Sequence, residues 1–69
     1  MTNTLKLKAA IAESGMNQEQ IAEALGVSVV TFSYKLNNKH EFRASEIMKL
    51  CKILHITEVN TIFFAQEVE

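Results

Sequence analysis

Apolar residues recur along this chain at helical spacing, and polar residues or glycine separate the repeats. The clearest repeat has apolar residues at i, i+3, i+4 and i+7: Ile47, Leu50, Cys51 and Leu54. This spacing predicts a helix over residues 44–54 with one buried face. The other apolar repeats are shorter, and each ends at a recognisable helix boundary.

A first helix is predicted over residues 5–14. Leu7 and Ile11 lie four residues apart and define its buried face. Thr4 is the candidate N-terminal cap, because a threonine hydroxyl can accept a hydrogen bond from a free amide of the first turn. Gly15 is the expected end of this helix, since glycine readily adopts the left-handed conformation that closes many helices.

The second predicted helix begins after Asn17. Gln20 stands three residues beyond Asn17, which is the spacing of a capping box. The buried stripe of this helix consists of three apolar residues: Ile21, Ala22 and Leu25. Gly26 is expected to end it, and only the segment 26–28 then separates it from the next helix.

Ser28 is the expected cap of a third helix over roughly residues 29–37, whose inward face carries Phe32 and Leu36. The polar residues that follow predict a loop, with Phe42 as its anchor in the core. After the helix over residues 44–54, Thr57 is the candidate cap of a short final helix. The inward residues of that final helix are Val59, Ile62 and Phe63.

The composition supports an all-α fold. The chain has 69 residues and no proline, and its two glycines, Gly15 and Gly26, lie between apolar segments. We therefore expect one domain over residues 1–64, a compact bundle of about five short helices, followed by a frayed tail over residues 65–69. A domain of this size buries only about 60% of the surface of its unfolded chain, so its core is marginal.

Several classes of function are not expected. The single cysteine cannot form an intramolecular disulfide, and with only His40 and His55 beside it no metal-binding set exists, so no cofactor is expected. The chain has no aspartate and no nucleophile paired with a base, which argues against an enzyme. No small-molecule ligand is expected. No apolar run approaches the ~18 residues of a membrane span, and no signal region is present, so we expect a cytoplasmic protein without a membrane partner.

The short connection Gly26-Val27-Ser28 is the most informative local feature. Glycine at the end of one helix and a serine cap at the start of the next produce an abrupt corner between two helices. Such a three- to four-residue turn is typical of a helix-turn-helix, here over residues 18–37. In that arrangement the second helix protrudes from the bundle.

The residues around this corner resemble the phage Cro/repressor (Xre-type) helix-turn-helix family. The resemblance is carried by Gln18, Ile21-Ala22, Leu25-Gly26-Val27-Ser28, Thr31-Phe32-Ser33, Asn37-x-Lys39 and the downstream segment EIMKLCKILHIT. It covers nearly the whole chain and is nearest to the small stand-alone regulators of phages and prophages of Gram-positive bacteria. It implies a lambda-repressor-like fold and a double-stranded DNA operator as partner. In two places the chain departs from the family pattern: Lys35-Leu36 inverts the usual aliphatic and polar order, and Asn38 stands where glycine is usual.

The resemblance implies that the helix over residues 29–37 enters the major groove, where its outward residues read bases. The base-reading candidates are Val29, Val30, Ser33 and Tyr34. The two valines can pack against thymine methyl groups, and the two hydroxyl side chains can form hydrogen bonds with bases. The alternatives are that the valines belong to the core and that Tyr34 only packs on the neighbouring loop.

A second group of residues is expected to bind the DNA backbone. These candidates are Gln18, Ser28, Lys35, Asn37, Asn38, Lys39 and Arg43. Gln18 matches the position at which the family grips a phosphate, and a helix N-terminus there can bind the same anion. The net charge of −1 argues weakly against a nucleic-acid partner, but three of the four charges between residues 33 and 45 are basic, with Glu41 as the fourth. The alternative is that these cations only solvate the surface.

A homodimer is expected, because helix-turn-helix proteins bind paired half-sites about 34 Å apart. Phe63 and Phe64 are adjacent and cannot both face one core, so Phe64 and Ile53 are the candidate dimer contacts. The alternative is that Phe64 only covers the edge of the core. Promoter occlusion, and therefore repression, is the simplest mechanism. The rival function is a protein-binding module on the same scaffold, such as an antirepressor or an antitoxin-like partner.

Overall fold

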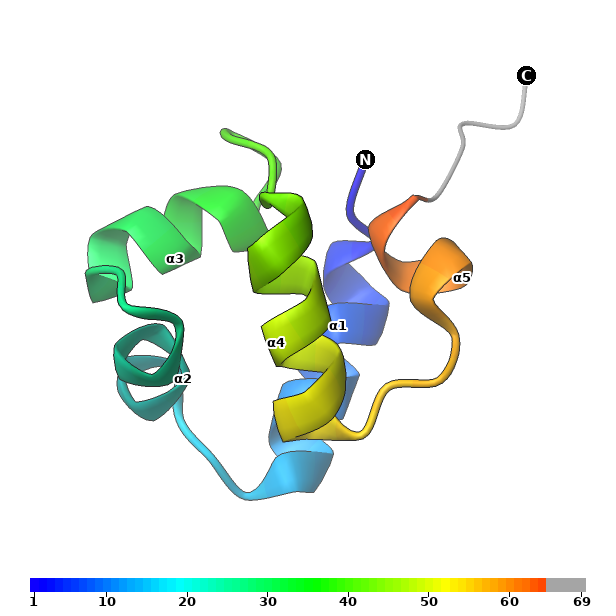
Figure 1. The fold of residues 1–69 in the computed structure, drawn as a ribbon, viewed down its shortest axis with the longest axis horizontal. Coiled ribbons are helices and arrows are strands. Elements are labelled where there is room, and N and C mark those ends of the chain that lie inside the picture. The colour runs from blue at the N-terminus through cyan, green and yellow to red at the C-terminus, as the bar shows by residue number, and fades with distance from the viewer. Residues whose placement is uncertain (65–69) are drawn as a thin grey trace.

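The computed structural model describes residues 1–64, and within this range the chain is helical and contains no strand (Figure 1). The helices are α1 (Thr4–Ser14), α2 (Gln18–Leu25), α3 (Val29–Leu36), α4 (Ala44–Leu54) and α5 (Val59–Phe63). The expected all-α bundle of about five short helices is confirmed for this part of the chain. The predicted tail over residues 65–69 lies outside the described residues.

The N-terminal cap of α1 differs from the prediction. Asn3, not Thr4, caps the helix, and its side chain accepts a hydrogen bond of 3.1 Å from the Lys6 amide. Thr4 begins the helix, and its hydroxyl donates instead to the carbonyl of Leu36, at 2.7 Å. The Thr4 hydroxyl is thus engaged with the end of α3, and Asn3 supplies the cap.

The caps of α2 and α3 follow the prediction. The capping box of α2 is complete, because the Gln20 amide donates to the Asn17 side chain at 2.8 Å and the Asn17 amide donates to the Gln20 side chain at 3.0 Å. Ser28 caps α3 by accepting a bond of 3.1 Å from the Thr31 amide. The expected cap at Thr57 is wrong, since Glu58 occupies that position in α5 and makes no capping bond through its side chain.

The core consists mainly of the apolar stripes that the sequence predicts, although Ile47, Cys51 and Val59 are only partly buried. Its buried members come from every helix and are Leu7, Ile11, Ile21, Ala22, Leu25, Phe32, Leu36, Leu50, Leu54, Ile62 and Phe63. Phe42 is half-buried and anchors the loop between α3 and α4. Its ring centroid lies 6.0 Å from that of Phe32 and 5.7 Å from that of Phe63. This row of three aromatic rings connects α3 to α5.

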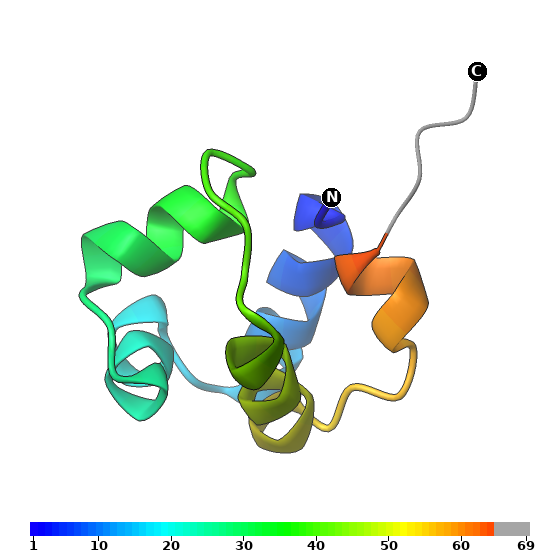
Figure 2. The same ribbon diagram turned by 45° about the horizontal axis from the view of Figure 1, so that its top comes forward.

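The helices form two ends and a centre (Figures 1 and 2). In both views α2 and α3 make up one end of the molecule, α5 lies at the other end, and α1 and α4 lie between them. The first residues of the chain lie between the loop after α3 and α5. Within residues 1–64, no helix has the length and apolar character needed to cross a bilayer.

Candidate nucleic-acid interface

The corner between α2 and α3 is closed by backbone hydrogen bonds. The Val27 amide donates to the Ala22 carbonyl at 3.0 Å, and the Gly26 amide donates to the Glu23 carbonyl, also at 3.0 Å. This pair of bonds is a Schellman motif, which requires a left-handed residue at its centre. Gly26 supplies that conformation with φ +77°. As a result α2 is seen nearly end-on in Figure 1, while α3 runs across the view.

Helix α3 turns one face inward and the other to solvent. Phe32 and Leu36 are fully buried, whereas Val29, Val30 and Tyr34 are 40%, 57% and 45% exposed. The alternative in which the two valines belong to the core is therefore not what the structure shows. Both valines lie in the first turn of α3, at the protruding end of the molecule (Figure 1).

Tyr34 is also held from one side. Its ring centroid lies 5.9 Å from that of His40, with an angle of 40° between the ring planes. His40 reaches this position because its own amide and that of Lys39 both approach the Tyr34 carbonyl, at 3.4 and 2.8 Å. Nothing in the spacing of His40 along the sequence indicates that the loop after α3 folds back over Tyr34. The tyrosine thus has a supported ring and an exposed edge.

Lys35 does not lie on the outer face, and its assignment to the DNA backbone is wrong. Its side chain is 11% exposed, and its Nζ lies 2.7 and 2.8 Å from the two carboxylate oxygens of Glu46. Glu46 also accepts a bond of 2.8 Å from the Arg43 amide at the start of α4. Lys35 takes an inward position because Glu46 compensates its charge there. This ion pair joins α3 to α4 and explains why the chain inverts the usual aliphatic and polar order at residues 35–36.

Asn38 is exposed, but its side chain is bonded to the N-terminal segment. It has φ +63°, so it adopts the left-handed backbone in place of the glycine usual there. Its side-chain oxygen accepts from the Thr2 amide and its side-chain nitrogen donates to the Thr2 carbonyl, both at 2.9 Å. Its carboxamide is thus engaged with the N-terminal segment, and a contact of Asn38 with the DNA backbone stays a prediction.

The remaining backbone candidates lie at or near the surface. Lys39, Arg43, Asn37 and Ser28 are exposed, and Gln18 is half-buried at the first turn of α2. Two of these side chains have local partners. The Ser28 hydroxyl donates to the Thr31 hydroxyl at 3.0 Å, and the side-chain nitrogen of Asn37 donates to the Ser33 carbonyl at 2.9 Å. Ser33 is half-buried. Because Lys35 is buried, the exposed cations next to α3 in this region are Lys39 and Arg43.

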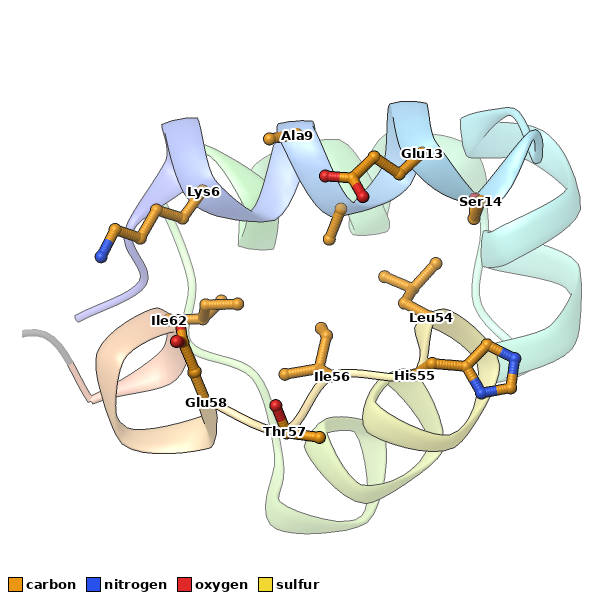
Figure 3. Close-up of a pocket in the computed structure, with 11 residues that line it drawn as sticks. Lys6, Ala9, Glu13, Ser14, Leu54, His55, Ile56, Thr57, Glu58 and Ile62 are labelled. Atoms are coloured by element: carbon orange, nitrogen blue, oxygen red, sulfur yellow. The ribbon is translucent and has the colours of Figure 1, made fainter.

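A groove in the described part of the chain lies away from α3. It has a volume of about 580 Å³ and is bordered by α1, by the loop after α4 and by the end of α5. Leu54 and Ile56 point into this groove, whereas Lys6 and His55 extend outward at its two ends (Figure 3). Among residues 1–64 no three His, Cys, Asp or Glu side chains are grouped in a way that could hold a metal ion. Burial raises the pKa of the Cys51 thiol, which favours its protonated and unreactive form.

Comparison with known proteins agrees with this geometry. Residues 6–63, most of the chain, match the family model described as the Cro/C1-type HTH DNA-binding domain. The match includes both helices of the corner and the whole of α4. A search of proteins with curated descriptions gives no match.

The buried ion pair predicts a large difference between single and paired substitutions. Lys35→Met should lower the free energy of unfolding by about 3 kcal/mol, because it leaves the Glu46 carboxylate buried without its cation. Lys35→Met combined with Glu46→Leu should be close to neutral, since both charges are then removed. Urea unfolding followed by circular dichroism measures these differences. Lys39→Met, at an exposed lysine, is the matched control, and a single substitution at Lys35 as mild as this control would contradict the assignment.

The same pair predicts a dependence of stability on pH. Burial alone raises the pKa of Glu46, but the hydrogen bonds from Lys35 and the Arg43 amide, together with both positive charges, lower it below its ordinary value of 4.5. A lowered pKa in the folded state means that the stabilisation is present above about pH 4.5 and is lost as the pH falls through the folded pKa. The paired variant should therefore lose less stability than the original chain on acidification.

Proposed function

Because the chain belongs to the Cro/C1-type HTH DNA-binding domain family, we propose that it is a sequence-specific transcriptional regulator whose helix α3 enters the major groove of its operator. The observation that carries this proposal is the outward face of α3, where Val29, Val30 and Tyr34 are exposed while the opposite face is buried. Branched apolar side chains in an exposed first turn are not stabilised by contact with water. A duplex DNA groove offers them thymine methyl groups.

Base reading in this proposal depends on the first half of α3. Val29 and Val30 contact thymine methyl groups, and the Tyr34 hydroxyl forms a hydrogen bond with a base edge or a neighbouring phosphate. The packing of Tyr34 against His40 supports this role, since it limits the ring to few orientations before binding. Ser33 is half-buried and contributes at most its hydroxyl group.

Backbone contacts in this proposal flank α3 on two sides. On one side, Gln18 and the free amides of the first turn of α2 hold a phosphate, since a helix N-terminus attracts anions. On the other side, Lys39 and Arg43 extend from the loop between α3 and α4 and from the start of α4. Asn37 and Ser28 are secondary candidates, because each already has a local partner. Such contacts fix the register of the protein on the duplex, while base contacts determine its sequence preference.

Repression by promoter occlusion is the regulatory mechanism that we propose. A protein bound across a promoter excludes the polymerase without any further activity. The resemblance to small phage and prophage regulators of Gram-positive bacteria supports a role in the same kind of genetic switch. A homodimer is part of this proposal, with Phe64 as its main contact, since this side chain is 54% exposed beside the buried Phe63. Ile53 is half-buried against the core and contributes only its exposed part.

The decisive experiment is the selection of bound duplexes from a random pool. We expect an enriched sequence with two-fold symmetry, whose half-sites are about one helical turn apart. Binding should weaken steeply with salt, as expected for a protein that neutralises phosphates. Absence of any duplex binding at low salt would contradict the proposal and would favour a protein-binding module on the same scaffold.

Tyr34→Ala should weaken binding to the selected duplex by about 1–3 kcal/mol, the scale of a good base-edge contact. Tyr34→Phe keeps the ring against His40 and removes only the hydroxyl, so it separates the two contributions. Fluorescence anisotropy titration at fixed salt measures both affinities. An unchanged affinity of the alanine variant would exclude Tyr34 from the reading set.

Lys39→Ala should weaken binding to all duplex sequences and lower the slope of log K against log salt by about 0.9, the value for one lost phosphate contact. Lys52→Ala is the matched control, because Lys52 is an exposed lysine in the last turn of α4, away from the loop that carries Lys39. Titrations at several salt concentrations give both slopes. A slope equal to that of the original chain would argue against a phosphate role for Lys39.

The chain should sediment at twice its monomer mass of 7.8 kDa at micromolar concentration, or with two chains per duplex when bound to the selected DNA. Phe64→Lys should shift this equilibrium to the monomer, because it places a charge at the proposed contact. Leu5→Lys, at a more exposed apolar residue of α1, is the control and should leave the mass unchanged. A monomer mass under both conditions would refute the dimer.

A further inference from the structure

The first residues of the chain are tied to the end of α3. Asn38 exchanges two hydrogen bonds of 2.9 Å with the backbone of Thr2, one with its amide and one with its carbonyl. The Thr4 hydroxyl donates to the carbonyl of Leu36, the last residue of α3, at 2.7 Å. The Asn38 side chain also reaches the Thr4 hydroxyl, at 3.4 Å. We call these bonds between Thr2, Thr4, Leu36 and Asn38 the N-terminal clasp.

The clasp acts on the backbone that carries Lys39. The Lys39 amide donates to the Tyr34 carbonyl at 2.8 Å, and the Asn38 amide donates to the Lys35 carbonyl at 3.2 Å. These two bonds form a Schellman motif at the C-terminus of α3, with Asn38 as its left-handed residue. Lys39 therefore follows directly after the residue that the clasp holds. The clasp and the helix end together fix the point from which the Lys39 side chain extends.

The presence of asparagine instead of glycine at position 38 supports a role for its side chain. Glycine adopts the left-handed conformation with the least strain, and it would complete the Schellman motif equally well. It would not supply the carboxamide that binds both backbone groups of Thr2. The segment is also held at its other side, because the Asn3 amide donates to the Ile62 carbonyl of α5 at 2.6 Å. Together with this bond, the clasp connects the end of α3 to the far end of the bundle (Figure 2).

We propose that Thr2, Thr4 and Asn38 are positioning residues for DNA binding, which act through Lys39 without contacting DNA. This inference rests on the proposed function. Ordering a loop upon binding costs conformational entropy, and that cost subtracts from the affinity. The clasp orders the loop in the free protein. The loop therefore loses less conformational entropy when Lys39 binds its phosphate.

The test uses a fluorescein-labelled duplex of random sequence at low salt, because a phosphate contact does not depend on sequence. Thr4→Val keeps the shape of the side chain and removes the hydroxyl, and it should weaken binding about three- to tenfold. Thr4→Ser keeps the hydroxyl and should restore most of the affinity. Thr57→Val, at an exposed threonine in the loop before α5, is the matched control and should bind as the original chain does.

A double-mutant cycle separates positioning from a general loss of structure. In a Lys39→Ala background, Thr4→Val should cost less than about twofold, since the residue through which the clasp acts is absent. Amide exchange at Lys39 should also be faster in Thr4→Val than in the original chain. If Thr4→Val does not fold, Asn38→Gly provides the same cycle, because glycine retains the left-handed backbone and deletes the carboxamide.

Two results would overturn the inference while leaving the proposed function intact: a clasp variant that is folded and binds as tightly as the original chain, or an equal loss with and without Lys39. Failure of the original chain to bind the duplex at low salt would overturn the proposed function and, with it, this inference. A reduced affinity that depends on Lys39 and is restored by Thr4→Ser would support the positioning role.

Discussion

The rotation of α3 about its own axis is the constraint on which the proposed interface depends. The buried ion pair between Lys35 and Glu46 holds α3 against α4 through two short hydrogen bonds. Hydrogen bonds are directional, whereas apolar contacts tolerate small slides and rotations. Glu46 also accepts the Arg43 amide, so the same carboxylate fixes the start of α4. With Lys35 directed inward, the face that carries Val30 and Tyr34 is directed outward.

Both ends of α3 are fixed as well. At its start, Gly26 closes α2 and Ser28 caps α3 within three residues. At its end, the Schellman motif around Asn38 and the contact with Thr4 close the last turn. A domain of this size has a marginal core, so such local bonds account for a larger share of its order than in a large protein. The row of three aromatic rings centred on Phe42 adds a long-range connection from α3 to α5.

The charges of the chain are consistent with a small DNA interface that combines a few cations with apolar side chains. The net charge is −1, and the burial of Lys35 removes one cation from the outer surface. Lys39 and Arg43 remain beside α3, with Glu41 exposed between them. In the proposed complex, shape and apolar contact with the groove would therefore contribute more to binding than in a strongly basic protein, where phosphate neutralisation dominates. Pairing of two subunits on one operator would double the small number of contacts that each α3 makes.

The sequence by itself determined the helices, their caps at Asn17 and Ser28, the corner at Gly26 and the buried faces, because each of these follows from residues a few positions apart. Only the tertiary structure decided the roles of Lys35 and Asn38. Their partners, Glu46 and Thr2, lie 11 and 36 residues away along the chain, and no local spacing indicates them. A charged or amide side chain on a helix or loop has the same sequence signature whether it faces solvent or a buried partner. Packing alone, by bringing a compensating group within hydrogen-bond distance, makes the inward position of Lys35 favourable.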